Sequence, residues 1–176
     1  VKNMKIKHKL LKEYIYELRE LYRGYANRTL YVNLSDNTIK EKPVSEEMKE
    51  KFIGGKGFGL RLLWDATKDD TKWDDPENEI NIAAGPIGGI TQYSGCGKSL
   101  VVSISPTTDS IMDCNVGGYF GPFLKFAGFD AIEIQGKAEK DVIVVVDGTK
   151  GTVRIEEAPE EAVDSHVLAE QLTEMY

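Results

Sequence analysis

The stretch Asn115–Gly121 reads NVGGYFG and lies in a glycine-rich segment between two strand candidates. Glycine adopts left-handed backbone conformations and lets a ligand approach the main chain closely. Upstream, the apolar run Leu100–Ser105 predicts a strand, and downstream Ala131–Gln135 predicts another. The connection Pro106–Gly128 is therefore expected to be a loop that joins two strands of a sheet.

Working outward from this loop, short runs of β-type composition are bounded by turn residues. These further strand candidates are Thr29–Leu34, Thr38–Val44, Ile80–Ala84, Val142–Val146 and Thr152–Glu156. Turn residues at Ser35–Asn37 and Asp147–Gly148 predict two hairpins. The strands do not alternate regularly with long helices, which argues against a doubly wound fold. The expected class is α+β, with mostly antiparallel sheets and a few helices.

The sequence predicts fewer helices than strands. Apolar residues at helical spacing predict an amphipathic helix over residues 5–22, so residues 1–23 are interpreted as a helical extension. Ser45 is expected to cap a short helix that ends near Gly54. A second helix is expected over Gly57–Trp64, with Leu60, Leu63 and Trp64 on one side, and a last helix over residues 160–175.

Composition excludes several classes of function. The 176 residues carry a net charge of -7, which argues against nucleic-acid binding. No apolar run approaches the ~20 residues that span a bilayer, so no membrane contact is expected. Two separated cysteines, Cys96 and Cys114, and two histidines, His8 and His166, support neither a disulfide framework nor a self-contained zinc or iron–sulfur site. A reducing cytoplasm is the expected location.

Glycine is the main functional signal, concentrated in Gly54–Gly59, Gly85–Gly97 and Gly117–Gly121. Such loops serve either as tight turns of a β-rich domain or as cradles of backbone N–H groups for anions. Gly95–Ser99 imitates the end of a P-loop, but Gln92 stands where its first glycine belongs and a strand follows. We find no catalytic triad or acid/base pair, so the sequence predicts a binding module.

At these loops the chain resembles the tungsten-containing aldehyde:ferredoxin oxidoreductases. The matching segments, in order, are Gly24–Ser35, Phe52–Gly57, Pro76–Asn78, Ala83–Gly89, Ser105–Thr108, Asn115–Gly121, Leu124–Ile132 and Gly136–Ala138. The resemblance covers about residues 24–158 and implies that 24–176 are part of a β-rich N-terminal pterin-binding domain.

The resemblance implies a tungsten (or molybdenum) ion held by two pterins, with magnesium bridging the pterin phosphates. It implies oxidation of aldehydes to carboxylic acids, with electrons passing through a [4Fe–4S] cluster to ferredoxin. Asn115 matches a residue whose carbonyl reaches the magnesium ion, and Gly117 matches a backbone pterin contact. Lys98 stands where the family often has an arginine that reaches the pterin, and lysine keeps the charge but loses the bidentate fork.

The family's iron–sulfur cysteines and second pterin loop belong to sequence outside this chain. Three readings remain open: a small subunit completed by a larger catalytic chain, a truncated product, or a relative that serves only as a partner-binding or assembly domain. Apolar surface that faces the absent half should be exposed, which predicts a partner chain or self-association.

Overall fold

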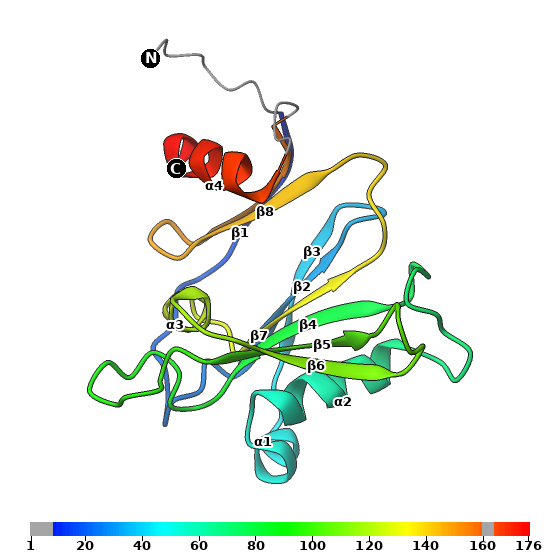
Figure 1. Ribbon diagram of the computed structural model, residues 1–176. Helices are drawn as coiled ribbons and strands as arrows, with labels where there is room; N and C mark the ends of the chain where they lie inside the picture. The colour runs from blue at the N-terminus through cyan, green and yellow to red at the C-terminus, as the bar shows by residue number, and fades with distance from the viewer. Residues whose placement is uncertain (1–8, 160–163) are drawn as a thin grey trace.

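The computed structural model describes residues 9–159 and 164–176, which form two sheets and four helices (Figure 1). The larger sheet contains, in spatial order, β3 (Thr38–Pro43), β2 (Arg28–Asn33), β7 (Ala131–Gln135), β4 (Glu79–Ala84), β5 (Ser99–Ile104) and β6 (Ile111–Val116). The smaller sheet contains β1 (Leu10–Ile15), β9 (Thr152–Glu157) and β8 (Val142–Asp147). Only β2 and β7 pair in parallel, so the predicted α+β class with mainly antiparallel sheets is confirmed.

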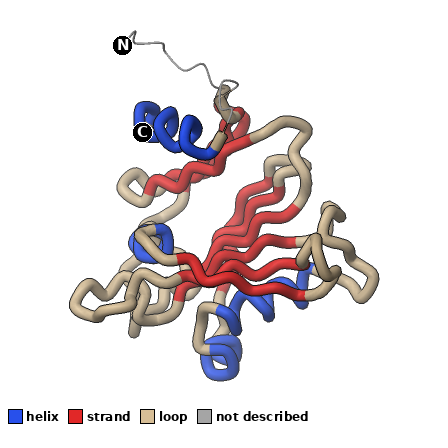
Figure 2. The backbone as a smooth tube through the Cα atoms, in the orientation of Figure 1, coloured by secondary structure: helices blue, strands red, loops and turns tan. Residues whose placement is uncertain are grey.

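Helices α1 (Glu46–Phe52) and α2 (Lys56–Ala66) cover one face of the larger sheet, and the smaller sheet lies on the other side (Figures 1 and 2). Helix α3 (Phe120–Phe126) lies near one end of the strands, and α4 (Ser165–Met175) follows the smaller sheet. The main core lies between the sheets and includes Leu30, Ile132 and Ile155. A second cluster around Phe58 and Ala131 packs the helices onto the larger sheet.

Most predicted elements are confirmed. Both hairpins form, as β2–β3 and β8–β9. The side chain of Ser45 accepts a hydrogen bond from the backbone N–H of Met48 at 3.1 Å, which caps α1 as expected. The inward face of α2 differs from the prediction, because Phe58, Gly59 and Leu63 are buried while Trp64 is 72% exposed.

The helix predicted over residues 5–22 is wrong. Residues 10–15 form β1, which pairs antiparallel with β9, and residues 16–21 have no regular structure; residues 5–8 lie outside the described part. Pairing satisfies backbone groups of β9 that would otherwise form a free sheet edge. It also places Leu11, Tyr14 and Tyr16 against the main core, so tertiary contact overrides the helical pattern.

The predicted loop Pro106–Gly128 contains two elements that the sequence reading missed. Strand β6 pairs with β5 along its whole length, yet its side chains are exposed or half-buried. Because β6 buries no side chain, its sequence lacks the apolar pattern that marks a half-buried strand. Helix α3 has only seven residues and contains Gly121 and Pro122, which both disfavour helix, so its sequence does not predict a helix.

Asp130 connects two strands of the larger sheet and helix α3. Its buried carboxylate pairs with Lys125 of α3 and accepts a hydrogen bond from the N–H of Ala26 at 3.0 Å. Its backbone N–H donates to the carbonyl of Arg28, and its carbonyl accepts from the N–H of Ala84. One residue therefore joins the start of β2, the end of β4 and α3.

Arg28 ties the two sheets together beside this point. Its guanidinium donates to Glu41 and to the carbonyl oxygens of Gly128 and Glu17, at 2.6 to 2.8 Å. It also lies within 5.3 Å of the ring centres of Tyr16 and Phe129. The residue is 2% exposed, and each of its three side-chain nitrogens donates a hydrogen bond.

We predict that Lys125→Met destabilises the chain strongly, by about 3–5 kcal/mol, because it leaves the Asp130 carboxylate buried without its cation. The measurement is urea unfolding followed by circular dichroism. Arg61→Met is the matched control, since its pair with Asp65 is solvent-exposed and worth little. Equal losses in the two variants would contradict the role given to Asp130.

A second buried group of charges lies on the helix-covered face of the larger sheet. Glu133 is buried; its carboxylate accepts from the Thr29 hydroxyl and pairs with Lys42. Glu79 is 1% exposed, and neither of its carboxyl oxygens has a hydrogen-bond partner among the described residues. Burial, and then the charge of Glu133, raise the pKa of Glu79 to about 7.

This raised pKa makes stability depend on pH. The folded chain holds a proton on Glu79 that the unfolded chain, with a pKa of 4.5, releases between about pH 4.5 and 7. The free energy of unfolding should therefore fall by about 3 kcal/mol from this group as pH rises through that window, and no further above it. Glu79→Gln should remove this component and be more stable than the unsubstituted chain at pH 8. Glu77→Gln, on an exposed side chain, should leave the pH profile unchanged.

Candidate functional site

The three glycine clusters of the sequence meet at one end of the larger sheet. Gly54 packs against the backbone of Ala84 and Gly85, and the N–H of Gly55 donates to the carbonyl of Ala84 at 3.1 Å. A Cβ added at Gly97 would stand 2.7 Å from the carbonyl oxygen of Gly118. The loops 85–98 and 117–121 therefore touch through their main chains, which only glycine permits at position 97.

Gly24, in the turn before β2, closes the same assembly. Its φ is +81°, and a Cβ there would clash with the carbonyl of Pro86 at 2.1 Å. A side chain at this position is excluded both by the left-handed conformation and by the neighbouring backbone. The turn before β2 is therefore packed against the glycine-rich loop that begins at Gly85, directly after β4.

Lys98 and Gly117 are brought together by the pairing of β5 with β6. Ser99 pairs with Val116, so the residues just beyond each strand end face each other. The Lys98 ammonium lies 3.7 Å from the point where a Cβ on Gly117 would stand. Lys98 is exposed and has no ion-pair partner within the described part of the chain.

Asn115 lies two residues before Gly117, on β6, where it pairs with Leu100 of β5. Its side chain is exposed, and β6 is the last strand of the larger sheet. The structure therefore gathers Lys98, Asn115 and Gly117 within one hairpin, although the sequence separates Lys98 from the other two. An uncommitted ammonium beside bare glycine backbone fits an anionic group such as a phosphate.

The remaining candidate residues form no catalytic centre. Cys96 is half-buried, Cys114 is exposed, and both are free thiols. His166 is exposed in the first turn of α4, and His8 lies outside the described residues. Across residues 9–159 and 164–176, no three His, Cys, Asp or Glu side chains are arranged to hold a metal ion.

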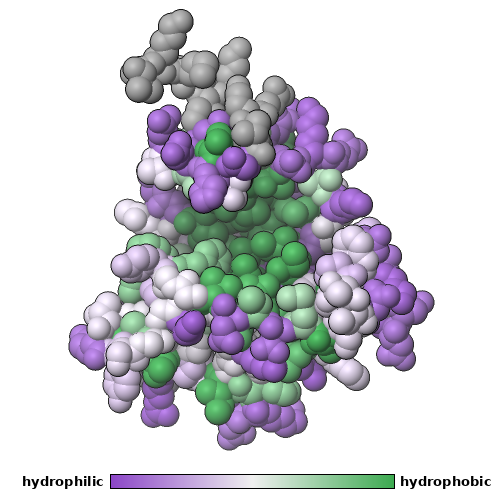
Figure 3. Space-filling model, viewed as in Figure 1, coloured by the Kyte–Doolittle hydropathy of each residue, from purple (hydrophilic) through white to green (hydrophobic). Residues whose placement is uncertain are grey.

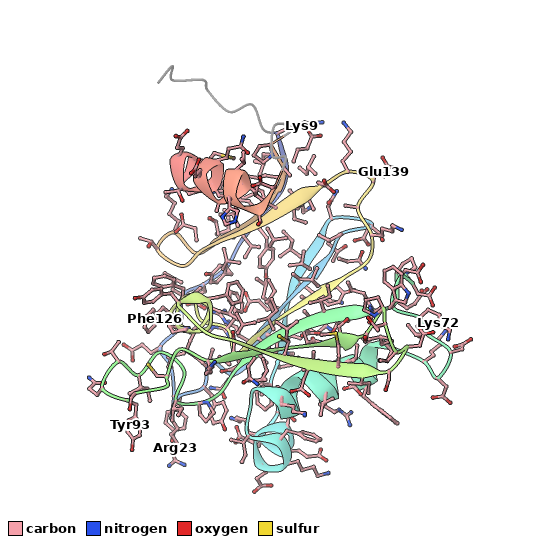
Figure 4. The ribbon with its side chains drawn as sticks, in the orientation of Figure 1. Lys9, Arg23, Lys72, Tyr93, Phe126 and Glu139 are labelled. Atoms are coloured by element: carbon pink, nitrogen blue, oxygen red, sulfur yellow. The ribbon has the colours of Figure 1, made fainter. Side chains whose placement is uncertain are left out.

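Exposed aromatic residues surround the glycine loops, a feature that the sequence reading did not assign. Tyr119, Phe120, Phe123 and Phe126 of the α3 region are each at least 45% exposed. Figure 4 shows Phe126 above the loop that carries Tyr93, which is 63% exposed. Phe126 also packs on Gly89, since a Cβ there would stand 2.9 Å from its ring. The sequence shows these four aromatic residues within a stretch of eight. Because helix α3 was not predicted, the surface that they share could not be predicted either.

An apolar hollow between the two sheets continues this surface (Figure 3). Ile82 and Ile134 of the larger sheet and Val142, Val144 and Val146 of β8 are only partly buried. Ile80 is 45% exposed. Contiguous apolar surface of this kind is typical of a contact with another polypeptide.

The sequence matches the family model described as aldehyde ferredoxin oxidoreductase, N-terminal domain, over residues 29–176. The chain belongs to the aldehyde ferredoxin oxidoreductase family. It is 42% identical over 133 residues to a tungsten-containing aldehyde ferredoxin oxidoreductase of Pyrococcus horikoshii, a match covering 74% of this chain and 21% of the relative. The corresponding enzyme of Pyrococcus furiosus is 44% identical over 126 residues, covering 70% and 20%.

Other relatives carry different names. An aliphatic sulfonate oxidoreductase, WOR-like subunit, of Pyrococcus furiosus is 34% identical over 137 residues, covering 77% of this chain and 21% of the relative. In the solved active-site complex BamBC of benzoyl coenzyme A reductase, one chain matches with a TM-score of 0.80 and 28% identity, covering 86% of this chain and 23% of that chain. The predicted fold of aldehyde ferredoxin oxidoreductase type is thereby confirmed.

The chain spans about a fifth of the length of the curated relatives that it matches. None of the described helices is long and apolar enough to cross a membrane.

We predict that Gly97→Ala forces the two glycine loops apart, because its methyl group would collide with the Gly118 carbonyl. The expected loss of stability is about 1–3 kcal/mol, as for other overpacked sites. Gly85→Ala is the control, since no atom lies within 4 Å of a Cβ there. Urea unfolding and the amide chemical shifts of Gly117 and Gly118 measure the effect. Indistinguishable stability and shifts in the two variants would contradict direct contact between the loops.

Proposed function

We propose that this chain forms half of the cradle for a tungsten (or molybdenum) bis-pterin cofactor in an aldehyde ferredoxin oxidoreductase. The complete enzyme would oxidise aldehydes to carboxylic acids and pass electrons to ferredoxin. The observation that carries the proposal is the free Lys98 ammonium beside the bare backbone of Gly117. The family match over residues 29–176 supports the same function.

Each of the three residues has a separate role in this proposal. Lys98 would bind an anionic oxygen of a pterin phosphate as a point charge. Gly117 would offer its main chain without a side chain in the way. Asn115 would contribute its backbone carbonyl to a magnesium ion that bridges the pterin phosphates, since magnesium takes oxygen ligands. When bound, the cofactor supplies the redox chemistry, and these residues orient it.

Activity would require further polypeptide. The described residues offer no metal-holding cluster, and the match covers only about a fifth of the length of the curated relatives. A [4Fe–4S] cluster would therefore sit on other domains, and ferredoxin would contact the complete enzyme. The exposed aromatics around α3 and the apolar hollow fit a larger catalytic chain, or a second copy of this chain, packed over the glycine loops. With only two cysteines, both free, a cytoplasmic location fits.

The test is metal and pterin analysis of the chain purified together with the polypeptide that carries the remaining family domains. We predict tungsten or molybdenum with pterin in the complex. Lys98→Ala should lower cofactor occupancy severalfold because the pterin anion loses its cation, and Lys98→Arg should retain it. Lys72→Ala is the control, because Lys72 lies at the opposite end of the larger sheet from the Tyr93 loop (Figure 4). Unchanged occupancy in Lys98→Ala would remove Lys98 from the site.

A second candidate is a non-catalytic partner-binding or assembly domain. The exposed aromatics of the α3 region favour it, because they suit a protein contact with or without a cofactor. This function predicts a complex that forms but contains no tungsten, molybdenum or pterin. A chain that sediments as a monomer and finds no partner would argue against both candidates.

A further inference from the structure

A cavity of about 600 Å³ lies between the larger sheet and helices α1 and α2. It is distinct from the glycine loops. Strand β4 begins at Glu79, which lines the cavity, and ends at Ala84 beside the loops, so about 17 Å of strand separates them. The wall opposite the sheet is formed by α1 and α2; it carries the apolar side chains of Met48, Phe52 and Leu62 together with charged side chains of both helices.

The floor of the cavity holds two buried carboxyl groups. Glu133 is satisfied by the Thr29 hydroxyl and by the Lys42 ammonium. Glu79 is equally buried, and both of its oxygens lack hydrogen-bond partners in residues 9–159 and 164–176. The amide of Asn81, on the same face of β4 but outside the cavity lining, is also buried without a hydrogen-bond partner among the described residues. Burying such groups without partners costs free energy, which a ligand that donates hydrogen bonds would recover.

The other charges of the cavity are mostly matched. The charged side chains that line it are Lys40 and Lys42 of β3, Glu79 of β4, Glu133 of β7, Glu47 and Lys51 of α1, and Arg61 and Asp65 of α2. Lys51 pairs with Glu47 and Arg61 pairs with Asp65, each within its own helix. Lys40 lies over the Tyr31 ring and is exposed. Glu79 is therefore the carboxyl group of the cavity that forms no ion pair with the described residues, although the charge of Lys42 partly offsets the rise of its pKa.

We propose that this cavity binds a small primary alkylammonium ion. The ammonium group would donate to the Glu79 carboxylate, and the alkyl chain would lie along Met48, Phe52 and Leu62. A compact head with three N–H donors suits the two carboxyl oxygens of Glu79, which accept no hydrogen bond from the described residues. An anion would meet two carboxylates on the floor. A metal ion is disfavoured because no group of three suitable ligand residues occurs in the described part of the chain.

The probe is n-butylammonium chloride, titrated into the purified chain at constant ionic strength and followed by amide chemical shifts. At pH 8 we expect saturable binding, with the largest shifts on β4 and β7 around Glu79 and Glu133. Binding needs ionised Glu79, whose pKa is about 7, while the probe stays protonated throughout. The affinity should therefore fall by about tenfold for each pH unit below 7.

Substitution and probe controls separate the ammonium contact from simple filling of an apolar cavity. Glu79→Gln keeps the shape and should weaken binding at pH 8 at least tenfold and remove its pH dependence. Glu77→Gln, exposed at the preceding turn, should bind as the unsubstituted chain does. Neutral n-butanol and anionic butyrate should neither bind comparably nor compete.

Absence of saturable binding at pH 8 would overturn the proposal. Equal binding of n-butanol, or binding that Glu79→Gln leaves intact, would overturn it as well. Measuring the affinity of the unsubstituted chain for n-butylammonium at several pH values tests the proposal without any substitution. An affinity that does not change with pH would exclude Glu79 as the partner. None of these binding measurements depends on the tungsten or pterin content of the chain. Their result is therefore independent of the proposed function.

Discussion

A single buried carboxylate, that of Asp130, is the constraint on which the arrangement of loops depends. It lies at the start of β7, in the middle of the larger sheet, and is held by Lys125 of α3 and by the N–H of Ala26. A buried charge of this kind is tolerated only while its partners stay in place. Because those partners lie on α3 and just before β2, the same contact fixes the helix and the turn that border the glycine loops.

The glycine loops then determine what the site offers to a ligand. Gly97 lets the loop before β5 meet the backbone after β6, and Gly24 lets the β2 turn close on Pro86. The result is bare main chain beside the Lys98 ammonium, which forms no ion pair with the described residues, and this combination suits an anionic group. No metal-holding group of His, Cys, Asp or Glu occurs among the described residues, and in the function that we propose the domain orients the cofactor.

The two faces of the larger sheet serve different purposes. The face toward the smaller sheet is apolar, and part of it remains exposed in the hollow with the valines of β8. The face toward α1 and α2 carries Glu79, Asn81 and Glu133 along two neighbouring strands. Buried polar groups are normally hydrogen-bonded, but Glu79 has no hydrogen-bond partner among the described residues. Burial, and then the charge of Glu133, raise its pKa.

The sequence by itself determined the α+β class, most strands, both hairpins and the Ser45 cap, because these features depend on local composition and turn chemistry. It also indicated the family, through glycine motifs whose order and spacing the structure explains by backbone contacts at Gly24 and Gly97. Only the tertiary structure decided that residues 10–15 are a strand, because the open edge of β9 outweighs their helical periodicity. It alone placed Lys98 beside Gly117 through the β5–β6 pairing, and Glu79 beside Glu133 through the β4–β7 pairing. Contacts between residues distant in sequence depend on strand order and register, which local patterns do not specify.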